Sequence, residues 1–104
     1  MNINIRAVNM ELTPAIKQYV EEKFTSLDKF TGDIMQIDVD LGKESNHHNK
    51  GKIMNCAAVL ELKGDVIKVE RAAEDLYKAI DKVRDHLRET LAQMKEKKIK
   101  DRQS

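Results

Sequence analysis

The chain has 104 residues, of which 40% are hydrophobic, 36% charged and 4% aromatic, and its net charge is +1. This length suits one domain with one core. The single cysteine, Cys56, excludes an intramolecular disulfide, and no apolar stretch approaches the ~18 residues of a membrane span. The N-terminus lacks the basic and apolar regions of a signal peptide, so we expect a soluble protein of the cytoplasm.

The first two predicted elements are a strand and a helix. Apolar residues alternate with polar ones over residues 2–8, which is the pattern of a half-buried strand. Thr13 and Pro14 then supply an N-cap and a first helical residue. Apolar residues recur at helical spacing as far as Phe30, and Gly32 ends this helix.

Three further strands are predicted at 33–42, 52–62 and 66–72. In the first of these, Met35, Ile37, Val39 and Leu41 alternate with polar residues and are expected to point inward. The stretch 43–51 has no apolar residue and is predicted to be a mobile loop. Residues 63–65 should form a tight hairpin turn, with Gly64 at positive φ.

The stretch 72–100 is predicted to form one long helix with a single apolar stripe. The stripe consists of Leu76, Ile80, Val83, Leu87, Leu91 and Met94. Short strands cover only part of such a helix, so the turns past Met94 should project beyond the core. We therefore expect a single domain over 1–94 and a basic helix end or frayed tail over 95–104.

The order β-α-β-β-β-α predicts an α+β fold with two layers. The first strand joins the sheet through a helical crossover and should pair in parallel, while the later strands form an antiparallel meander. Both helices should cover one face of this four-stranded mixed sheet. The other face should stay exposed to water, with its charged residues Asp38, Asp40, Lys68 and Glu70.

No catalytic site, cofactor or metal site is predicted. His47 and His48 are adjacent in the polar loop, but no further metal ligands accompany them. Cys56 alternates toward the core and is interpreted as a small buried hydrophobe. The chain has no glycine-rich phosphate loop and no suggestive Ser/His/Asp order, so we predict that it is not an enzyme.

The distribution of charge points to binding. Basic residues outnumber acidic ones in 66–104, whereas acidic residues are slightly in excess before residue 66. This gradient suits a surface that faces a polyanion, and it equally suits a solvated helix end whose cations complement the helix dipole. Lys82 and His86 flank the apolar stripe on one side, and Arg84, Arg88 and Lys95 on the other. With the first helix they form a face that suits an RNA backbone.

Three segments resemble one known family. They are "MNINIRAVNMELT" at the start, "LTPAIKQYVEEKFTSLDKF" at 12–30 and "EDLYKAIDKVRDHL" at 74–87. They are similar to the ribosome hibernation-promoting factor and ribosome-associated inhibitor family, short type, which is also labelled as modulators of an alternative sigma factor. The resemblance covers residues 1–100 and implies a fold similar to a double-stranded-RNA-binding domain.

The resemblance implies a translation inhibitor that binds rRNA of the small ribosomal subunit at the decoding region and blocks the mRNA and tRNA path in idle ribosomes. Short members act with, or against, a separate ribosome modulation factor. We expect no membrane partner, no small-molecule substrate and a monomer in isolation. The RNA-binding candidates are Lys23, Lys29, Lys82, Arg84, His86, Arg88, Lys95, Lys97 and Lys98.

In the family, basic residues usually follow the matched core, whereas this chain has His86, Glu89, Ala92 and Gln93 at those positions. Glu89 places a negative charge where the resemblance predicts a positive one. The alternative function is a protein-interaction module whose acidic sheet and helix surfaces bind a regulatory protein, such as an alternative sigma factor. The two hypotheses differ in salt dependence, because phosphate contacts weaken steeply with added salt and an apolar protein interface does not.

Overall fold

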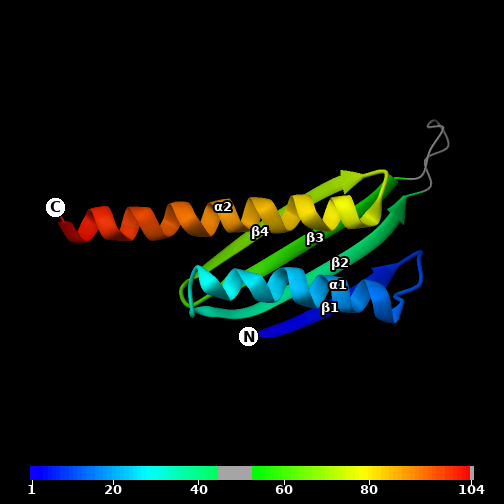
Figure 1. The fold of residues 1–104 in the computed structure, drawn as a ribbon, viewed down its shortest axis with the longest axis horizontal. Helices are drawn as coiled ribbons and strands as arrows, with labels where there is room; N and C mark the ends of the chain where they lie inside the picture. The colour runs from blue at the N-terminus through cyan, green and yellow to red at the C-terminus, as the bar shows by residue number, and fades with distance from the viewer. Residues whose placement is uncertain (45–52, 104) are drawn as a thin grey trace.

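A computed structural model describes the backbone of residues 1–44 and 53–103 and the side chains of residues 1–43 and 53–97. Its elements, in chain order, are β1 (Asn2–Val8), α1 (Pro14–Thr25), the 3₁₀ helix η1 (Ser26–Lys29), β2 (Ile34–Glu44), β3 (Ile53–Leu62), β4 (Asp65–Ala73) and α2 (Leu76–Gln103). Figure 1 shows both helices crossing the same sheet, with α2 the longer.

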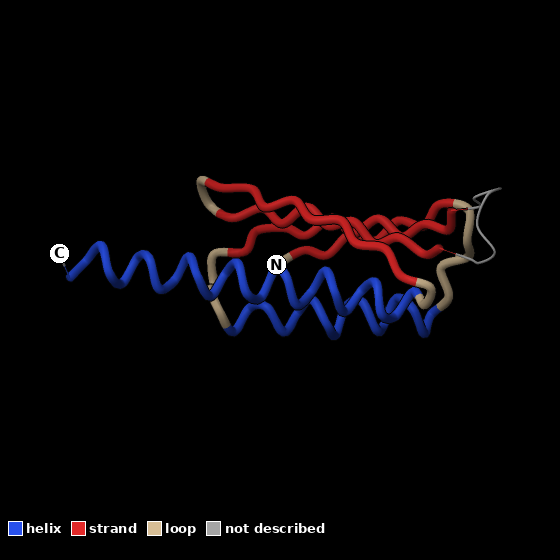
Figure 2. The backbone as a smooth tube through the Cα atoms, turned by 90° about the horizontal axis from the view of Figure 1, so that it is seen from above, coloured by secondary structure: helices blue, strands red, loops and turns tan. Residues whose placement is uncertain are grey.

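The four strands form one sheet in the order β1-β2-β3-β4. The pair β1 and β2 is parallel, and the other two pairs are antiparallel. Viewed from above, the strands lie in one layer and both helices in the other (Figure 2). The predicted α+β fold is therefore confirmed, including the parallel first pair and the common face of the two helices.

The core lies between these two layers and is purely apolar. Its fully buried side chains include Phe24 and Leu27 from the first helical segment, Ile37 and Leu60 from the sheet, and Leu87 from α2. The predicted stripe of α2 is buried from Leu76 to Leu91, with Ala79 as an additional member. Cys56 is fully buried, which confirms its interpretation as a core residue.

The prediction that Met35 points inward is wrong. Ile34 pairs with Leu62 and Gln36 pairs with Glu61, so β2 contains one extra residue at this point. This bulge shifts the alternation of the strand. Ile34 is therefore buried, while 58% of Met35 is exposed.

Several predicted boundaries also shift. The predicted loop at 43–51 begins later, because β2 continues to Glu44; residues 45–52, with His47 and His48, lie outside the described residues. The first α-helix ends at Thr25 and tightens into η1 before Gly32. Ala72 and Ala73 belong to β4 rather than to the long helix.

Local chemistry explains where both helices begin. Thr13 caps α1, because its hydroxyl accepts a hydrogen bond from the backbone N–H of Ile16 at 3.2 Å. Asp75 does the same for α2 by accepting the N–H of Tyr77 at 2.9 Å. Between β3 and β4, Gly64 has a φ of 84°, which confirms the predicted turn.

The last turns of α2 extend past the end of the sheet (Figure 2). The molecule is consequently elongated, with a longest dimension of 54 Å. The division of the chain into a domain over 1–94 and a tail over 95–104 stays a prediction. Within the described residues, no helix is both long and apolar enough to cross a membrane.

Candidate nucleic-acid interface

The predicted RNA-binding side chains lie on the helical layer, but not as a single cluster. They form two rows on opposite flanks of α2. The inter-helix row faces α1 and contains Lys23, Arg84, Arg88 and Lys95. The β4-side row contains Lys82 and His86, and the structure adds Arg71 from β4 to it.

Contacts with α1 define the inter-helix row. Asp81 accepts a hydrogen bond from the hydroxyl of Tyr19 at 2.7 Å, and Lys23 Nζ lies 3.6 Å from the same carboxylate. Asp81 therefore faces α1. Arg84 and Arg88 follow it at i+3 and i+7, and such residues share one side of a helix.

The arginines of this row are already paired with an acid. Arg84 Nε lies 2.7 Å from Asp85 Oδ1, and Arg88 Nη2 lies 3.7 Å from the same oxygen. One carboxylate thus holds two guanidinium groups close together. An RNA phosphate at this position would compete with Asp85 for both of them, because both acceptors suit the guanidinium fork.

The β4-side row is held by contacts with the last strand. Lys82 Nζ donates to the carbonyl of Ala72 at 3.3 Å. Arg71 Nη2 lies 3.3 Å from His86 Nδ1. A guanidinium group only donates, so this contact requires Nδ1 of His86 to be free of a proton. Arg71 was not among the predicted residues, because a strand residue and a helix residue become neighbours only in the folded chain.

The remaining predicted cations are exposed. Lys29 lies on η1, and Lys97 lies on the part of α2 that approaches its C-terminus. Lys95 is also exposed and stands at the rim of a cavity described below. The side chain of Lys98 lies outside the described residues.

Aromatic residues sit among these cations, and the sequence-based prediction did not include them. The rings of Tyr19 and Tyr77 meet edge to face, with centroids 4.7 Å apart and planes at 88°. Lys23 Nζ lies 5.2 Å from the centroid of the Tyr19 ring. The hydrogen bond to Asp81 raises the pKa of Tyr19 to about 12, with burial and the Asp81 charge acting in the same direction.

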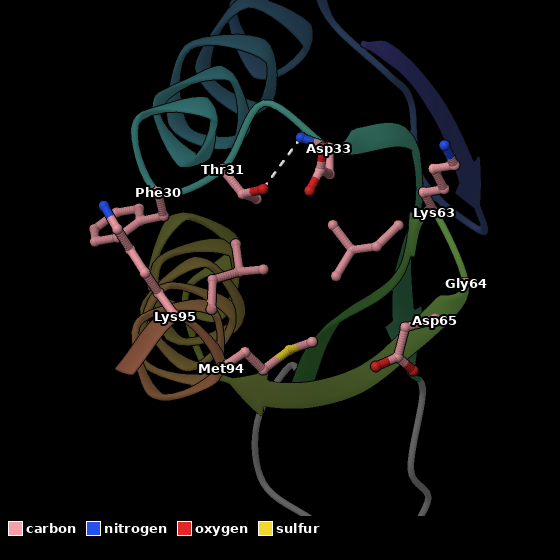
Figure 3. A pocket seen from close by; sticks show the side chains of 10 residues that line it. Phe30, Thr31, Asp33, Lys63, Gly64, Asp65, Met94 and Lys95 are labelled. Atoms are coloured by element: carbon pink, nitrogen blue, oxygen red, sulfur yellow. Dashed lines mark hydrogen bonds between the residues drawn. The ribbon is translucent and has the colours of Figure 1, made fainter. Parts of the chain in front are cut away.

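A cavity of about 460 Å³ lies where η1, the β3–β4 turn and α2 meet. Figure 3 shows Phe30 and Met94 at its wall, with Lys63, Asp65 and Lys95 toward its rim. Among the predicted RNA-binding residues whose side chains the structure describes, Lys95 lines it. The charges at its rim are of both signs, so the cavity does not favour an anion.

The open face of the sheet has the opposite character. Among the described side chains of this face, carboxylates outnumber cations: they are Asp38, Asp40, Glu61 and Glu70 against Arg6 and Lys68. Arg6 Nη2 lies 3.1 Å from Asp40 Oδ2 across the parallel pair. On the opposite, core-facing side of the sheet, burial raises the pKa of Cys56 to about 12, with a smaller contribution from the Asp40 charge.

Residues 3–99 match the model of a family described as Sigma 54 modulation protein / S30EA ribosomal protein. The ribosome hibernation promoting factor of Escherichia coli strain K12 is 32% identical over 97 residues, which cover 93% of this chain and 96% of that protein. The ribosome hibernation promotion factor of Deinococcus radiodurans is 34% identical over 95 residues; this chain spans about half of its length, 49%.

Among solved structures, the fold is similar to the N-terminal domain of Thermus thermophilus Protein Y. The TM-score is 0.80 and the sequences are 32% identical. The match covers 90% of this chain and 99% of that domain.

Proposed function

Because the chain belongs to the Sigma 54 modulation protein / S30EA ribosomal protein family, we propose that it is a ribosome hibernation factor. In this role it binds the small ribosomal subunit through rRNA at the decoding region. There it blocks the mRNA and tRNA path of idle ribosomes. The relatives named as hibernation factors support this role.

The proposed contact with RNA is supported by the difference in charge between the helical layer and the open face of the sheet. Cations outnumber carboxylates on α1, η1 and α2, while carboxylates outnumber cations on the open sheet face. A polyanion would therefore approach the helical layer. The two rows on α2 offer contacts to phosphates on both flanks of one helix, as suits a backbone read by shape and charge.

The mechanism is steric and needs no chemical step. An rRNA backbone docks along the helical layer, and the body of the domain occupies the space of mRNA and tRNA. Acting on ribosomes, the protein works in the cytoplasm and needs no cofactor. We propose that it is a monomer before binding and that a separate ribosome modulation factor acts beside it.

The regulatory-protein hypothesis is not favoured. The family description mentions sigma 54 modulation, but the relatives cited above are named for ribosome hibernation. We assign no partner to the acidic sheet face that the described residues form.

Co-sedimentation with purified small ribosomal subunits in a salt titration tests the proposal. Proteins that neutralise several phosphates lose roughly a hundredfold or more in affinity when salt rises fourfold. We expect binding at low salt that falls in this way, and displacement of the protein by mRNA together with initiator tRNA. Absence of binding at every salt concentration would refute the proposal.

A further inference from the structure

Tyr77 is a large, partly apolar side chain that is exposed on the helical layer. The large apolar side chains that are exposed in the described residues are Met1, Val8, Met35, Val66 and Tyr77. Of these, only Tyr77 lies on α1, η1 or α2, and 39% of it is exposed. Its ring is therefore not needed to fill the core, and part of it is accessible to a ligand.

The ring is held in position from two sides. The Asp75 carboxylate accepts the backbone N–H of Tyr77 and fixes the residue in the first turn of α2. Tyr19 packs against the ring edge to face, and its own hydroxyl is anchored on Asp81. A ring that is fixed before binding loses little conformational entropy when a ligand covers it.

Two lysines lie near the ring, together with the carboxylates of Asp75 and Asp81. Lys23 lies against Tyr19, and Lys78 follows Tyr77 on the exposed surface of α2. An aromatic face beside lysines is the arrangement by which proteins hold unpaired nucleotides, because the base stacks on the ring while the cations contact the phosphates.

We propose that Tyr77 is a stacking platform for one unpaired base of the bound RNA, with Tyr19 as its support and Lys23 and Lys78 near the flanking phosphates. This inference rests on the proposed function and names the part of the RNA that contacts Tyr77. It makes Tyr77 a binding residue of a different kind from the cations. The contribution of stacking does not depend on the release of counterions.

Two substitutions separate stacking from packing. Tyr77→Leu keeps an apolar contact with Tyr19 but removes the aromatic face, and Tyr77→Phe keeps that face. Loss of one stacked base weakens single-strand binding roughly ten- to a hundredfold. We expect a loss of this size for Tyr77→Leu in co-sedimentation with small ribosomal subunits, and an affinity close to wild type for Tyr77→Phe.

The salt dependence adds a second readout that a packing defect would not reproduce. Tyr77→Leu removes no phosphate contact, so the slope of log affinity against log salt should equal that of the wild type. Lys23→Gln should reduce this slope by about one. If Tyr77→Leu binds as tightly as the wild type, the stacking proposal is wrong while the proposed function stands. If the wild type does not bind, both are wrong.

Fluorescence gives a direct test in a folded protein. The chain has no tryptophan, so Tyr77→Trp introduces a single reporter. We expect added small subunits to quench its emission, because a stacked base quenches indole. Val66→Trp, at a residue that is 51% exposed on the open sheet face, is the control and should not change. A blue shift of the emission of Tyr77→Trp without quenching would show that a protein surface covers residue 77. Unchanged emission would show that nothing covers it. Either result overturns the stacking proposal.

Discussion

The open face of the sheet and the helical layer are both highly charged, yet they are organised differently. On the sheet, partners meet directly across strands: Asn4 donates to Asp38 and Arg6 to Asp40, each in register between β1 and β2. On the helices, Lys23 reaches Asp81 from the neighbouring helix, and two arginines share Asp85. The net charge near zero is therefore the sum of one face with an excess of acidic residues and another with an excess of basic residues.

A cation that is paired with a carboxylate on the protein surface can still bind a phosphate. An exposed ion pair contributes little to stability, because water and salt screen it and two side chains must be ordered. The pair of Arg88 with Asp85 is of this kind, with side chains 52% and 50% exposed, so a phosphate can replace Asp85 beside Arg88 at small cost. The helical layer can remain soluble and nearly neutral in isolation and still present cations to a polyanion.

The largest expected effect concerns the core that joins the two layers. Leu87 is fully buried, so Leu87→Ala leaves a cavity between α2 and the sheet. We expect a loss of about 2–5 kcal/mol in the free energy of unfolding. Val66→Ala on the open sheet face should change it by about 0.5 kcal/mol or less. Urea denaturation of both variants measures the difference, and equal losses would contradict the assignment of the core to one face only.

The second prediction tests which face binds. Lys82→Glu with Arg88→Glu reverses one cation in each row of α2. Removal of two phosphate contacts and the added repulsion should weaken binding to small subunits by roughly a hundredfold at low salt. The matched control, Arg6→Glu with Lys68→Glu, makes the same change in charge on the open sheet face and should bind like the wild type. A larger loss in the control would place the RNA on the sheet.

Most of this architecture was predictable, because each strand and helix repeats its apolar residues at the period of its own backbone. Met35 is the instructive failure. In the sequence, either Ile34 or Met35 could begin the row of inward-facing residues that continues at Ile37. Only the pairing of β2 with β3 shows that Met35 is the extra residue of a bulge. The alternation of apolar residues along one strand does not determine the register in which that strand pairs with its neighbour.

The candidate site was predictable in its cations but not in its contacts. Arg84 has acids at several helical spacings, and the structure pairs it with Asp85 rather than Asp81. Tyr19 and Asp81 are 62 residues apart in the chain and meet only because α1 and α2 lie side by side. Periodicity identifies the face of one helix, whereas contacts between two helices depend on how they pack.

A third prediction sharpens the role of the shared carboxylate. Asp85→Asn removes the competitor of two arginines in the inter-helix row. The pair of Arg88 with Asp85 is exposed and therefore weak, so the gain in affinity for small subunits should be about two- to fivefold. Asp40→Asn frees Arg6 on the sheet face in the same way and should leave the affinity unchanged. Unchanged binding of Asp85→Asn would mean that Arg84 and Arg88 do not contact the RNA.

The last prediction concerns the hydrogen bond that joins the helices. Tyr19→Phe removes the donor to Asp81, and we expect a loss of about 1 kcal/mol in the free energy of unfolding at pH 7. The hydroxyl donates only while it is protonated, and the pKa of Tyr19 is raised from 10.0 to about 12 in the folded protein. The stabilisation is therefore fully present below pH 10 and is lost as the pH rises through about 12. Denaturation of both proteins across this range should show their difference disappearing. A difference that persists unchanged above pH 12 would contradict the assignment of this stabilisation to the protonated hydroxyl. If the two proteins are equally stable at pH 7, the ring of Tyr19, which both retain, rather than its bond to Asp81 holds the two helices together, and Tyr77 is then supported by packing alone.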